Sequence, residues 1–261
     1  MKKAILAVSF GTSHIDTLEK TIDVIEKQMQ DTFPDYVVYR AFTSQMIINK
    51  LKKTKNLYVD NVEEALARMA ADQIEEVLVQ PTHIINGLEN DRMLSALGQF
   101  SGHFQTVQVG TPLLTTPKDY QEAILATIRN AFLAEDELLV FMGHGTCHHA
   151  NSAYPMLEYT AHAAGYPQVF VGTVEGFPGL ADVMRQLPVT GKKKIVLMPF
   201  MIVAGDHAKN DMAGDGESWK TELEAAGYEV RTILKGLGEL EGIRDILIQH
   251  MKTAETLITG Y

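Results

Sequence analysis

The sequence predicts an α/β protein of two similar lobes, each built around a parallel four-stranded sheet flanked by helices. Three observations lead to this fold class. Strand-like and helical patterns alternate along all 261 residues, which is typical of parallel sheets with right-handed crossovers. The strands are rich in Val, Ile and Leu without alternation, as expected where helices cover both faces of a sheet. A weak internal repeat also relates the two halves of the chain.

The first half opens with a short apolar run that passes directly into a glycine turn, so we interpret it as a strand and not as a signal peptide. Prolines at positions 34 and 81 end the first helix and the third strand. Apolar residues at helical spacing define the segments between the strands. The predicted strands are Lys3–Ser9, Tyr36–Ala41, Glu75–Gln80 and Phe104–Val109. The predicted helices are Ile15–Asp31, Met46–Leu51, Val62–Ala71 and Leu88–Phe100.

The second half repeats this alternation, and the polar segment after Ala204-Gly205 is also expected to be helical. The predicted strands are Glu137–Met142, Gln168–Thr173, Lys194–Pro199 and Tyr228–Thr232. The predicted helices are Tyr120–Phe132, Ser152–Ala163, Leu180–Leu187, Ser218–Ala226 and Ile243–Leu257. We expect an N-terminal lobe over 1–116 and a C-terminal lobe over 117–261, with a final helix (243–257) that could pack on either lobe.

Composition narrows the function classes. With 46% hydrophobic and 21% charged residues the chain is expected to fold as a globular protein. The formal net charge of −10 argues against a nucleic-acid or membrane surface, and we interpret the short lysine runs as solvated ends of helices and strands. A single cysteine, Cys147, excludes an internal disulfide and favours a cytoplasmic location. The oligomeric state stays open, and a homo-oligomer is possible.

The internal repeat aligns two pairs of strand ends. Val8–His14 aligns with Met142–His148, and Gln80–Glu89 aligns with Met198–His207. In this register Phe10 lies opposite His144, and Glu89 lies opposite His207. Since open α/β sheets bind ligands at the carboxyl ends of their strands, chemistry is expected there.

Polar residues follow three predicted strands of the second half. His144 lies between two glycines, which let a partner approach closely, and it lacks the apolar neighbours of a core histidine. His207 lies at a helix start, where the dipole favours the neutral imidazole that binds metal or accepts a proton, and Asp211 could orient its ring. Glu175 follows the middle strand. The alternatives are a solvated loop histidine, a first-turn surface histidine and an ordinary acidic turn.

Two histidines and a carboxylate suit a borderline divalent ion such as Co²⁺, Fe²⁺, Ni²⁺ or Zn²⁺, and ligand type does not choose among them. Glu89 could accept protons, or it could be an acidic residue stabilised in a helical first turn. Nucleotide-binding and nucleophile motifs are missing from the sequence, so no organic cofactor is expected. Cys147 is more typical of a structural cysteine than of a nucleophile.

At these residues the sequence resembles the class II tetrapyrrole chelatases, and among them the anaerobic sirohydrochlorin cobaltochelatases. The matching stretches are KKAILAVSFGTSH, RAFTSQMI, HIING, FMGHGTCHHA, LMPFMIVAGDHAKNDM and GESWK, which together span essentially the whole chain. The chain departs from the family pattern at Thr146 and at the Gly-Phe-Pro after Glu175, neither of which is a ligand position. The resemblance implies two flavodoxin-like lobes with an active-site cleft between them.

The resemblance also implies a function: insertion of Co²⁺ into sirohydrochlorin, a carboxylate-rich tetrapyrrole of the cobalamin pathway. Its implied metal ligands are His144, Glu175 and His207. We expect His144 to remove pyrrole protons with Glu89 as helper. The residues expected to contact the substrate are Ser9, Phe10, Gly11, Thr12, His83 and Glu89. Arg40, Arg92 and backbone amides at helix starts are candidates for binding its carboxylates.

Other functions remain open on sequence alone. The same fold could insert iron or nickel into a related tetrapyrrole, since most sites bind these ions in the order Fe²⁺ < Co²⁺ < Ni²⁺. A tetrapyrrole or metal carrier would use the same residues without turnover. A two-lobed receptor of the periplasmic type is a further alternative, against which the missing export signal argues.

Overall fold

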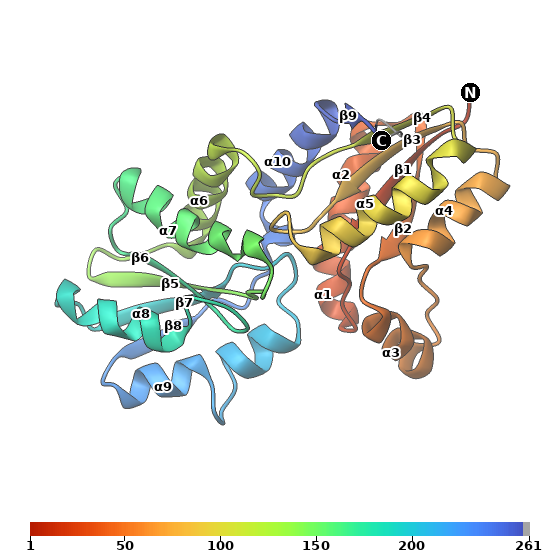
Figure 1. Cartoon of the computed structure of the whole chain (residues 1–261). Helices are drawn as coiled ribbons and strands as arrows, with labels where there is room; N and C mark the ends of the chain where they lie inside the picture. The colour runs from red at the N-terminus through yellow and green to blue at the C-terminus, as the bar shows by residue number, and fades with distance from the viewer. Residues whose placement is uncertain (258–261) are drawn as a thin grey trace. The chain divides into compact units, whose positions relative to one another are not determined.

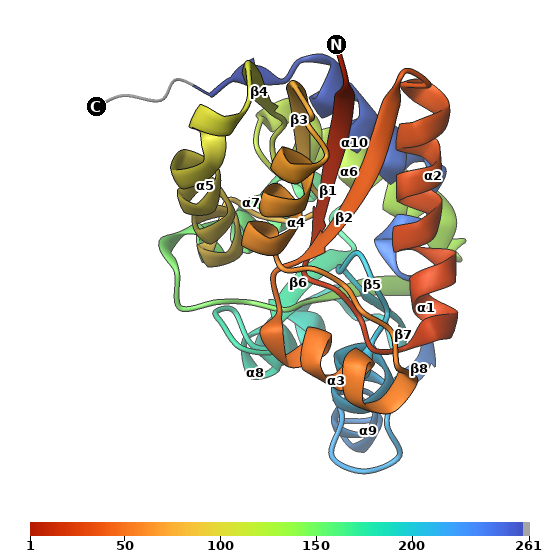
Figure 2. The same cartoon turned by 90° about the vertical axis from the view of Figure 1, so that its right-hand side faces the viewer.

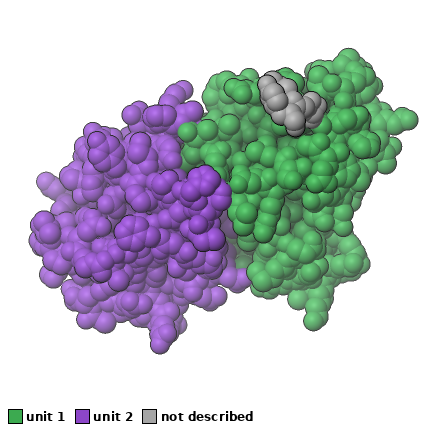
Figure 3. Space-filling model, viewed as in Figure 1, with its two compact units in different colours: residues 1–115, 244–261 green, residues 116–243 purple. Residues whose placement is uncertain are grey.

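The computed structural model describes residues 1–257. The chain forms two compact units (Figure 3): unit 1 comprises residues 1–115 and the chain from Arg244 onwards, and unit 2 comprises Thr116–Ile243. The final helix, whose lobe the sequence left open, therefore belongs mainly to unit 1. Arg244 Nε donates to Gln28 Oε1 at 2.8 Å, and Gln28 Nε2 donates to Asp245 Oδ1 at 2.8 Å.

Unit 1 is built on a sheet with the strand order β2-β1-β3-β4-β9. The strands are β1 (Lys3–Ser9), β2 (Tyr36–Phe42), β3 (Glu76–Pro81), β4 (Thr106–Val109) and β9 (Glu255–Thr256). The first four are parallel, and β9 runs antiparallel to β4. The helices are α1 (Ile15–Lys20), α2 (Ile22–Thr32), α3 (Gln45–Lys55), α4 (Val62–Ala71), α5 (Leu88–Phe100) and α10 (Glu241–Lys252). Figure 2 shows α1 and α2 on one side of this sheet and α4 and α5 on the other.

Unit 2 is built on a parallel sheet with the strand order β6-β5-β7-β8. The strands are β5 (Glu137–Gly143), β6 (Val169–Thr173), β7 (Lys194–Pro199) and β8 (Glu229–Thr232). The helices are α6 (Pro117–Ala131), α7 (Ala153–Ala163), α8 (Leu180–Gln186) and α9 (Trp219–Ala225), with a short π-helix, η4, at Ala208–Met212. α8, α9 and η4 pack their apolar side chains against one face of the sheet, and Figure 1 shows α6 and α7 on the other side.

The central strands are buried on both faces, which explains their unbroken apolar sequence. All residues of β5 are buried, as are six of the seven residues of β1. Gly172 in β6 leaves room for a tryptophan, because a Cβ there would lie 2.8 Å from the Trp219 ring. Trp219 shares its apolar cluster with Ala208 and Met212, so it joins α9 to the π-helix.

The two units share strand order and register, as the internal repeat predicted. Val8 pairs with Pro81 in unit 1, and Met142 pairs with Pro199 in unit 2. The match continues beyond the strands: Thr82 N donates to Val8 O at 2.8 Å, and Phe200 N donates to Met142 O at 2.8 Å. Positions in one unit can therefore be assigned to positions in the other.

Besides shifts in the bounds of several elements, such as β4, α3 and α6, the structure differs from the sequence prediction in three places. The predicted helix Ile15–Asp31 is two helices, because the backbone breaks at Thr21, whose hydroxyl donates to Thr17 O at 2.6 Å. The predicted final helix ends at Lys252, and the residues beyond it form β9, a fifth strand in the first sheet. The polar segment after Gly205 is helical as expected, but it contains a π-helix.

None of the helices in residues 1–257 has the length and apolar character needed to cross a bilayer.

Candidate metal centre

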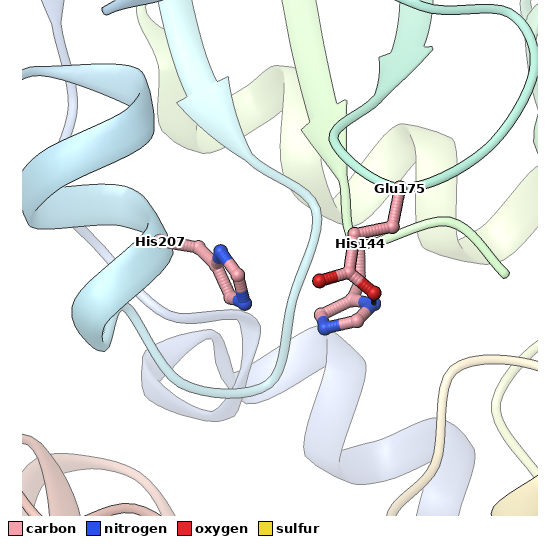
Figure 4. Close-up of side chains that lie close together, drawn as sticks. All are labelled: His144, Glu175 and His207. Atoms are coloured by element: carbon pink, nitrogen blue, oxygen red, sulfur yellow. Dashed lines mark ion pairs between the residues drawn. The ribbon is translucent and has the colours of Figure 1, made fainter.

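Three turns at the carboxyl ends of neighbouring strands bring His144, Glu175 and His207 together in unit 2 (Figure 4). His144 follows β5 directly, Glu175 lies two residues after β6, and His207 lies in the segment after β7. One ligand atom from each lies within 4.8 Å of the other two. All three residues are part-buried or exposed, so an ion can reach them from solvent. The structure thus brings together the three metal-ligand candidates of the sequence.

The turns that carry His144 and Glu175 are held to each other by their backbones. Glu175 N donates to His144 O at 2.7 Å, and Val174 N donates to Gly143 O at 3.0 Å. Gly145 has a φ of +81°, and a Cβ there would lie 2.5 Å from Gly176 N. Only glycine fits this close approach, because any side chain would push the two turns apart.

The side chains of Asn151 and Tyr154 hold the same two turns in place. Asn151 accepts from Thr146 N at 3.0 Å and donates to Phe177 O at 2.5 Å, which joins the turn after β5 to the turn after β6. The Tyr154 ring fills the space beside Gly143, where a Cβ would lie 2.3 Å away. Burial raises the pKa of Tyr154, against the opposing effect of the Gly145 and His144 backbone N–H groups beside its hydroxyl. Neither Asn151 nor Tyr154 has a sequence pattern that predicts this role.

Hydrogen bonds fix the tautomer that each imidazole adopts when it is neutral. His144 Nδ1 lies 2.9 Å from Gly145 O, and His207 Nδ1 lies 2.7 Å from Asp211 Oδ2. Since a carbonyl and a carboxylate only accept, each Nδ1 carries the hydrogen and each Nε2 keeps a lone pair for a metal. The Asp211 contact is the one that its spacing predicted.

The three side chains are close to, but not yet at, the spacing of ligands on one ion. The His144 and His207 rings meet edge to face, with centroids 4.8 Å apart, and Glu175 Oε2 lies 3.8 Å from His144 Nδ1. Metal–nitrogen bonds of about 2.1 Å limit two ligands of one ion to about 4.2 Å. A shift of about 0.6 Å therefore brings the widest spacing allowed here into range. The donor set suits a borderline divalent ion.

The equivalent positions in unit 1 are Phe10, Ser44 and Glu89. Ser44 N donates to Phe10 O at 3.3 Å, just as Glu175 N donates to His144 O, and the internal repeat pairs Glu89 with His207. Ser44 caps α3 by accepting from Ile47 N at 3.4 Å. Only one of these three positions offers a metal ligand of the His or carboxylate type, so the two units differ in chemistry although they share a fold.

The other substrate-contact candidates lie at the carboxyl edge of the unit 1 sheet. Ser9 is buried at the end of β1 and accepts from Thr82 Oγ1 at 2.9 Å. Phe10 is 42% exposed, and the buried Thr12 accepts from His14 N at 3.2 Å. Gly11 has a φ of +98° and lies against the Phe42 ring.

His83 and Glu89 follow β3 and lie at the same edge. His83 is buried with neither ring nitrogen hydrogen-bonded, and burial lowers its pKa to about 4. Glu89 Oε1 accepts from Arg92 at 2.9 Å, whereas Oε2 is buried without a hydrogen-bond partner. Each of these two residues therefore has polar atoms left for a ligand.

A model of the cobalt chelatase family (CbiK) matches residues 3–256. The chain belongs to this family. It is 42% identical over 260 residues to the sirohydrochlorin cobaltochelatase of Salmonella typhimurium, covering 97% of each chain. It is 36% identical over 259 residues to the sirohydrochlorin cobaltochelatase CbiKC of Nitratidesulfovibrio vulgaris, covering 97% of this chain and 90% of the relative.

Solved structures support the chelatase fold. The chain is similar to SirB from Bacillus subtilis, solved with Fe³⁺, with a TM-score of 0.63 over 97% of this chain and 95% of the other. The sequence identity is 11%, so this likeness concerns the fold alone.

The structure revises the expectations for the carboxylate-binding arginines and for the single cysteine of this cobalt chelatase family member. Arg40 is not available to substrate carboxylates, because its guanidinium is bound by Glu26 and Asp23 at 2.5–2.7 Å. Arg92 is exposed but paired with Glu89. Cys147 is a free, exposed thiol and therefore not a core residue.

Proposed function

We propose that this chain inserts Co²⁺ into sirohydrochlorin, releasing two protons for each ion inserted. The observation that carries the proposal is the constellation of His144, Glu175 and His207 at adjoining strand ends. Family membership and the cobaltochelatase activity for which both relatives are named support the reaction type and the substrate. The exposed thiol of Cys147 supports a reducing, cytoplasmic setting.

In the proposed first step the triad holds Co²⁺ as a substrate. The Nε2 atoms of His144 and His207 and a carboxylate oxygen of Glu175 bind the ion and leave its remaining positions open. Asp211 and Gly145 O keep the two Nδ1 hydrogens in place, which orients both lone pairs before the ion arrives. Backbone hydrogen bonds hold the Glu175 and His144 turns to each other, so the ion meets two ligands on one joined pair of turns.

In the second step the tetrapyrrole nitrogens replace the protein ligands one after another. As His144 releases the ion, its Nε2 lone pair takes a pyrrole proton. Glu89 is the proposed acceptor for the other proton, since its Oε2 is buried and has no hydrogen-bond partner. Both protons then pass to solvent, and the ring keeps the ion.

Ser9, Phe10, Gly11, Thr12 and His83 are the proposed contacts for the macrocycle. Phe10 offers an aromatic face to a flat ring, and the polar groups of the β1 and β3 ends offer hydrogen bonds to its side chains.

Replacement of His144 tests the proposal. General-base contributions are about 10²–10⁴-fold, so His144→Ala should lose at least about 10² of the cobalt-insertion rate, followed by absorbance. His162→Ala is the control, because that imidazole is bound to Val169 O at 2.7 Å and serves no proposed step. If folded His144→Ala inserts cobalt within a few-fold of the parent, the assignment is wrong. The same assay with Fe²⁺ and Ni²⁺ in competition establishes the preferred ion.

A further inference from the structure

The carboxyl edge of the unit 1 sheet has polar side chains at positions where unit 2 has apolar ones. Backbone hydrogen bonds fix the equivalence of these positions. Leu113 N donates to His83 O at 2.9 Å, and Leu237 N donates to Met201 O at 2.8 Å. His83 therefore occupies the place that Met201 occupies in unit 2.

Two neighbouring positions show the same exchange. Thr43 N donates to Ser9 O at 2.9 Å, and its counterpart Val174 N donates to Gly143 O at 3.0 Å. In the register of the internal repeat, Asn90 corresponds to Ala208, and Asn90 is 6% exposed.

The apolar counterparts in unit 2 lie on one face of its sheet. Met201 and Ala208 belong to one buried cluster, and Val174 packs against it. Since the folds match, we expect Thr43, His83 and Asn90 to line the same face of the unit 1 sheet at its carboxyl edge. We call these three residues the polar corner.

The polar corner is not explained by the stability of the fold. His83 is only 9% exposed, and neither of its ring nitrogens is hydrogen-bonded; the Thr43 hydroxyl is also buried without a partner. Leaving a buried polar group unsatisfied costs about 1–3 kcal/mol. Unit 2 demonstrates that methionine and valine fit the same backbone. Buried groups kept at such a cost are typical of sites that a ligand completes.

The hydrogen-bonding groups of the corner indicate what that ligand is. A neutral imidazole offers one N–H, a threonine hydroxyl offers one O–H, and an asparagine amide offers two N–H groups. Such a set of donors fits a group that only accepts, and an ionised carboxylate is the common biological example. Burial keeps His83 neutral near pH 7, which leaves it one donor and does not make it a strong base.

We propose that His83, Thr43 and Asn90 bind one carboxylate side chain of the tetrapyrrole. This inference rests on the proposed function, because it takes the macrocycle from there. The Glu89 carboxylate would repel a carboxylate side chain of the tetrapyrrole, so it is not part of this site. Its proposed partner is a pyrrole N–H.

The test replaces two residues of the polar corner by the residues found at the equivalent positions of unit 2. His83→Met and Thr43→Val are each titrated with metal-free sirohydrochlorin and with uroporphyrin I, a metal-free tetrapyrrole with carboxylate side chains, and binding is followed by absorbance. The dissociation constant should rise about tenfold in each variant, the effect of losing a hydrogen bond to a charged group. The Tm should stay level or rise, since an unsatisfied polar group has been removed. Co²⁺ binding at the triad in unit 2 should not change.

His250→Met is the matched control, because His250 is also a buried histidine of unit 1 but bonds Thr111 O at 3.0 Å. This variant should lose stability and keep its affinity for the macrocycle. The proposal is overturned if His83→Met and Thr43→Val bind both tetrapyrroles within twofold of the parent, as they would if water alone fills the corner. It is also overturned if their Tm falls as in His250→Met.

Since binding is measured without cobalt, the two proposals can fail separately. A parent protein that binds no tetrapyrrole refutes the proposed function. A parent that binds and inserts cobalt, with variants that bind equally well, refutes only the carboxylate site.

Discussion

Replacing Gly145 by alanine tests whether the close contact between the two ligand-bearing turns controls metal binding. The φ of +81° costs a side chain about 1–2 kcal/mol. The new Cβ would also lie 2.5 Å from Gly176 N, and ordinary contact begins at 3.4 Å, so the turns must separate by about 0.9 Å. Overpacking of this kind costs about 1–3 kcal/mol more.

Gly165→Ala provides the reference, because Gly165 has a φ of +91° with nothing within 4 Å of a Cβ. Gly165→Ala should be destabilised only by the unfavourable backbone conformation at positive φ. The free energy of unfolding of Gly145→Ala should therefore be about 1–3 kcal/mol lower than that of Gly165→Ala. In thermal unfolding each kcal/mol corresponds to a Tm difference of about 2–4 °C for a protein near this size.

The affinity for Co²⁺ should also differ between Gly145→Ala and Gly165→Ala. A shift of about 0.9 Å exceeds the roughly 0.5 Å tolerance of a preorganised site. Co²⁺ titration of Gly145→Ala should show an affinity at least about tenfold lower, the range seen when groups supporting a ligand are disturbed. Equal affinities and equal Tm values for Gly145→Ala and Gly165→Ala would refute the reasoning.

Three further predictions follow from the same structure. Asp211→Asn should weaken Co²⁺ binding about 10–100-fold in a calorimetric titration, and unchanged affinity would mean that the carboxylate does not orient its imidazole. Burial lowers the pKa of His83 to about 4 from 6.5 in the unfolded chain, so its contribution to stability is fully present above pH 6.5 and is lost as the pH falls towards 4. Urea unfolding should show that the parent loses about 3 kcal/mol of unfolding free energy over this range and that His83→Met does not. If the unfolding free energies of parent and variant depend equally on pH, the burial argument is contradicted. The triple variant Phe10→His, Ser44→Glu, Glu89→His should bind two Co²⁺ ions per chain instead of one, and a stoichiometry of one would argue against the equivalence of the units.

Strands and most helices were predictable because their signals are local. The central strands are continuous apolar runs, and Val62–Ala71 and Leu88–Phe100 have the bounds predicted from apolar spacing. A capping box at Asn61 also marks the start of the first of these helices. The break at Thr21 was missed because threonine fits a helical pattern until its hydroxyl bonds a backbone carbonyl. β9 was missed because two exposed residues acquire strand geometry only by pairing with β4.

The candidate metal centre was predictable in its residue types but not in its geometry. Histidines beside glycines at strand ends are visible in a sequence, and so was the Asp211 spacing. The backbone bond between Glu175 and His144 joins residues 31 positions apart, and no local pattern encodes it. Ser44 was overlooked as the counterpart of Glu175, because the repeat in the sequence does not extend to that turn; only strand register reveals it.

The packing of Trp219 gives the protein a built-in optical probe. The chain contains one tryptophan, and its ring lies against Gly172 in the cluster that also holds Ala208 and Met212, next to His207. Any shift of the π-helix when an ion is taken up changes the surroundings of this indole and no other. We therefore expect its intrinsic fluorescence to report the proposed loading and release of cobalt in real time, without a label and without the tetrapyrrole.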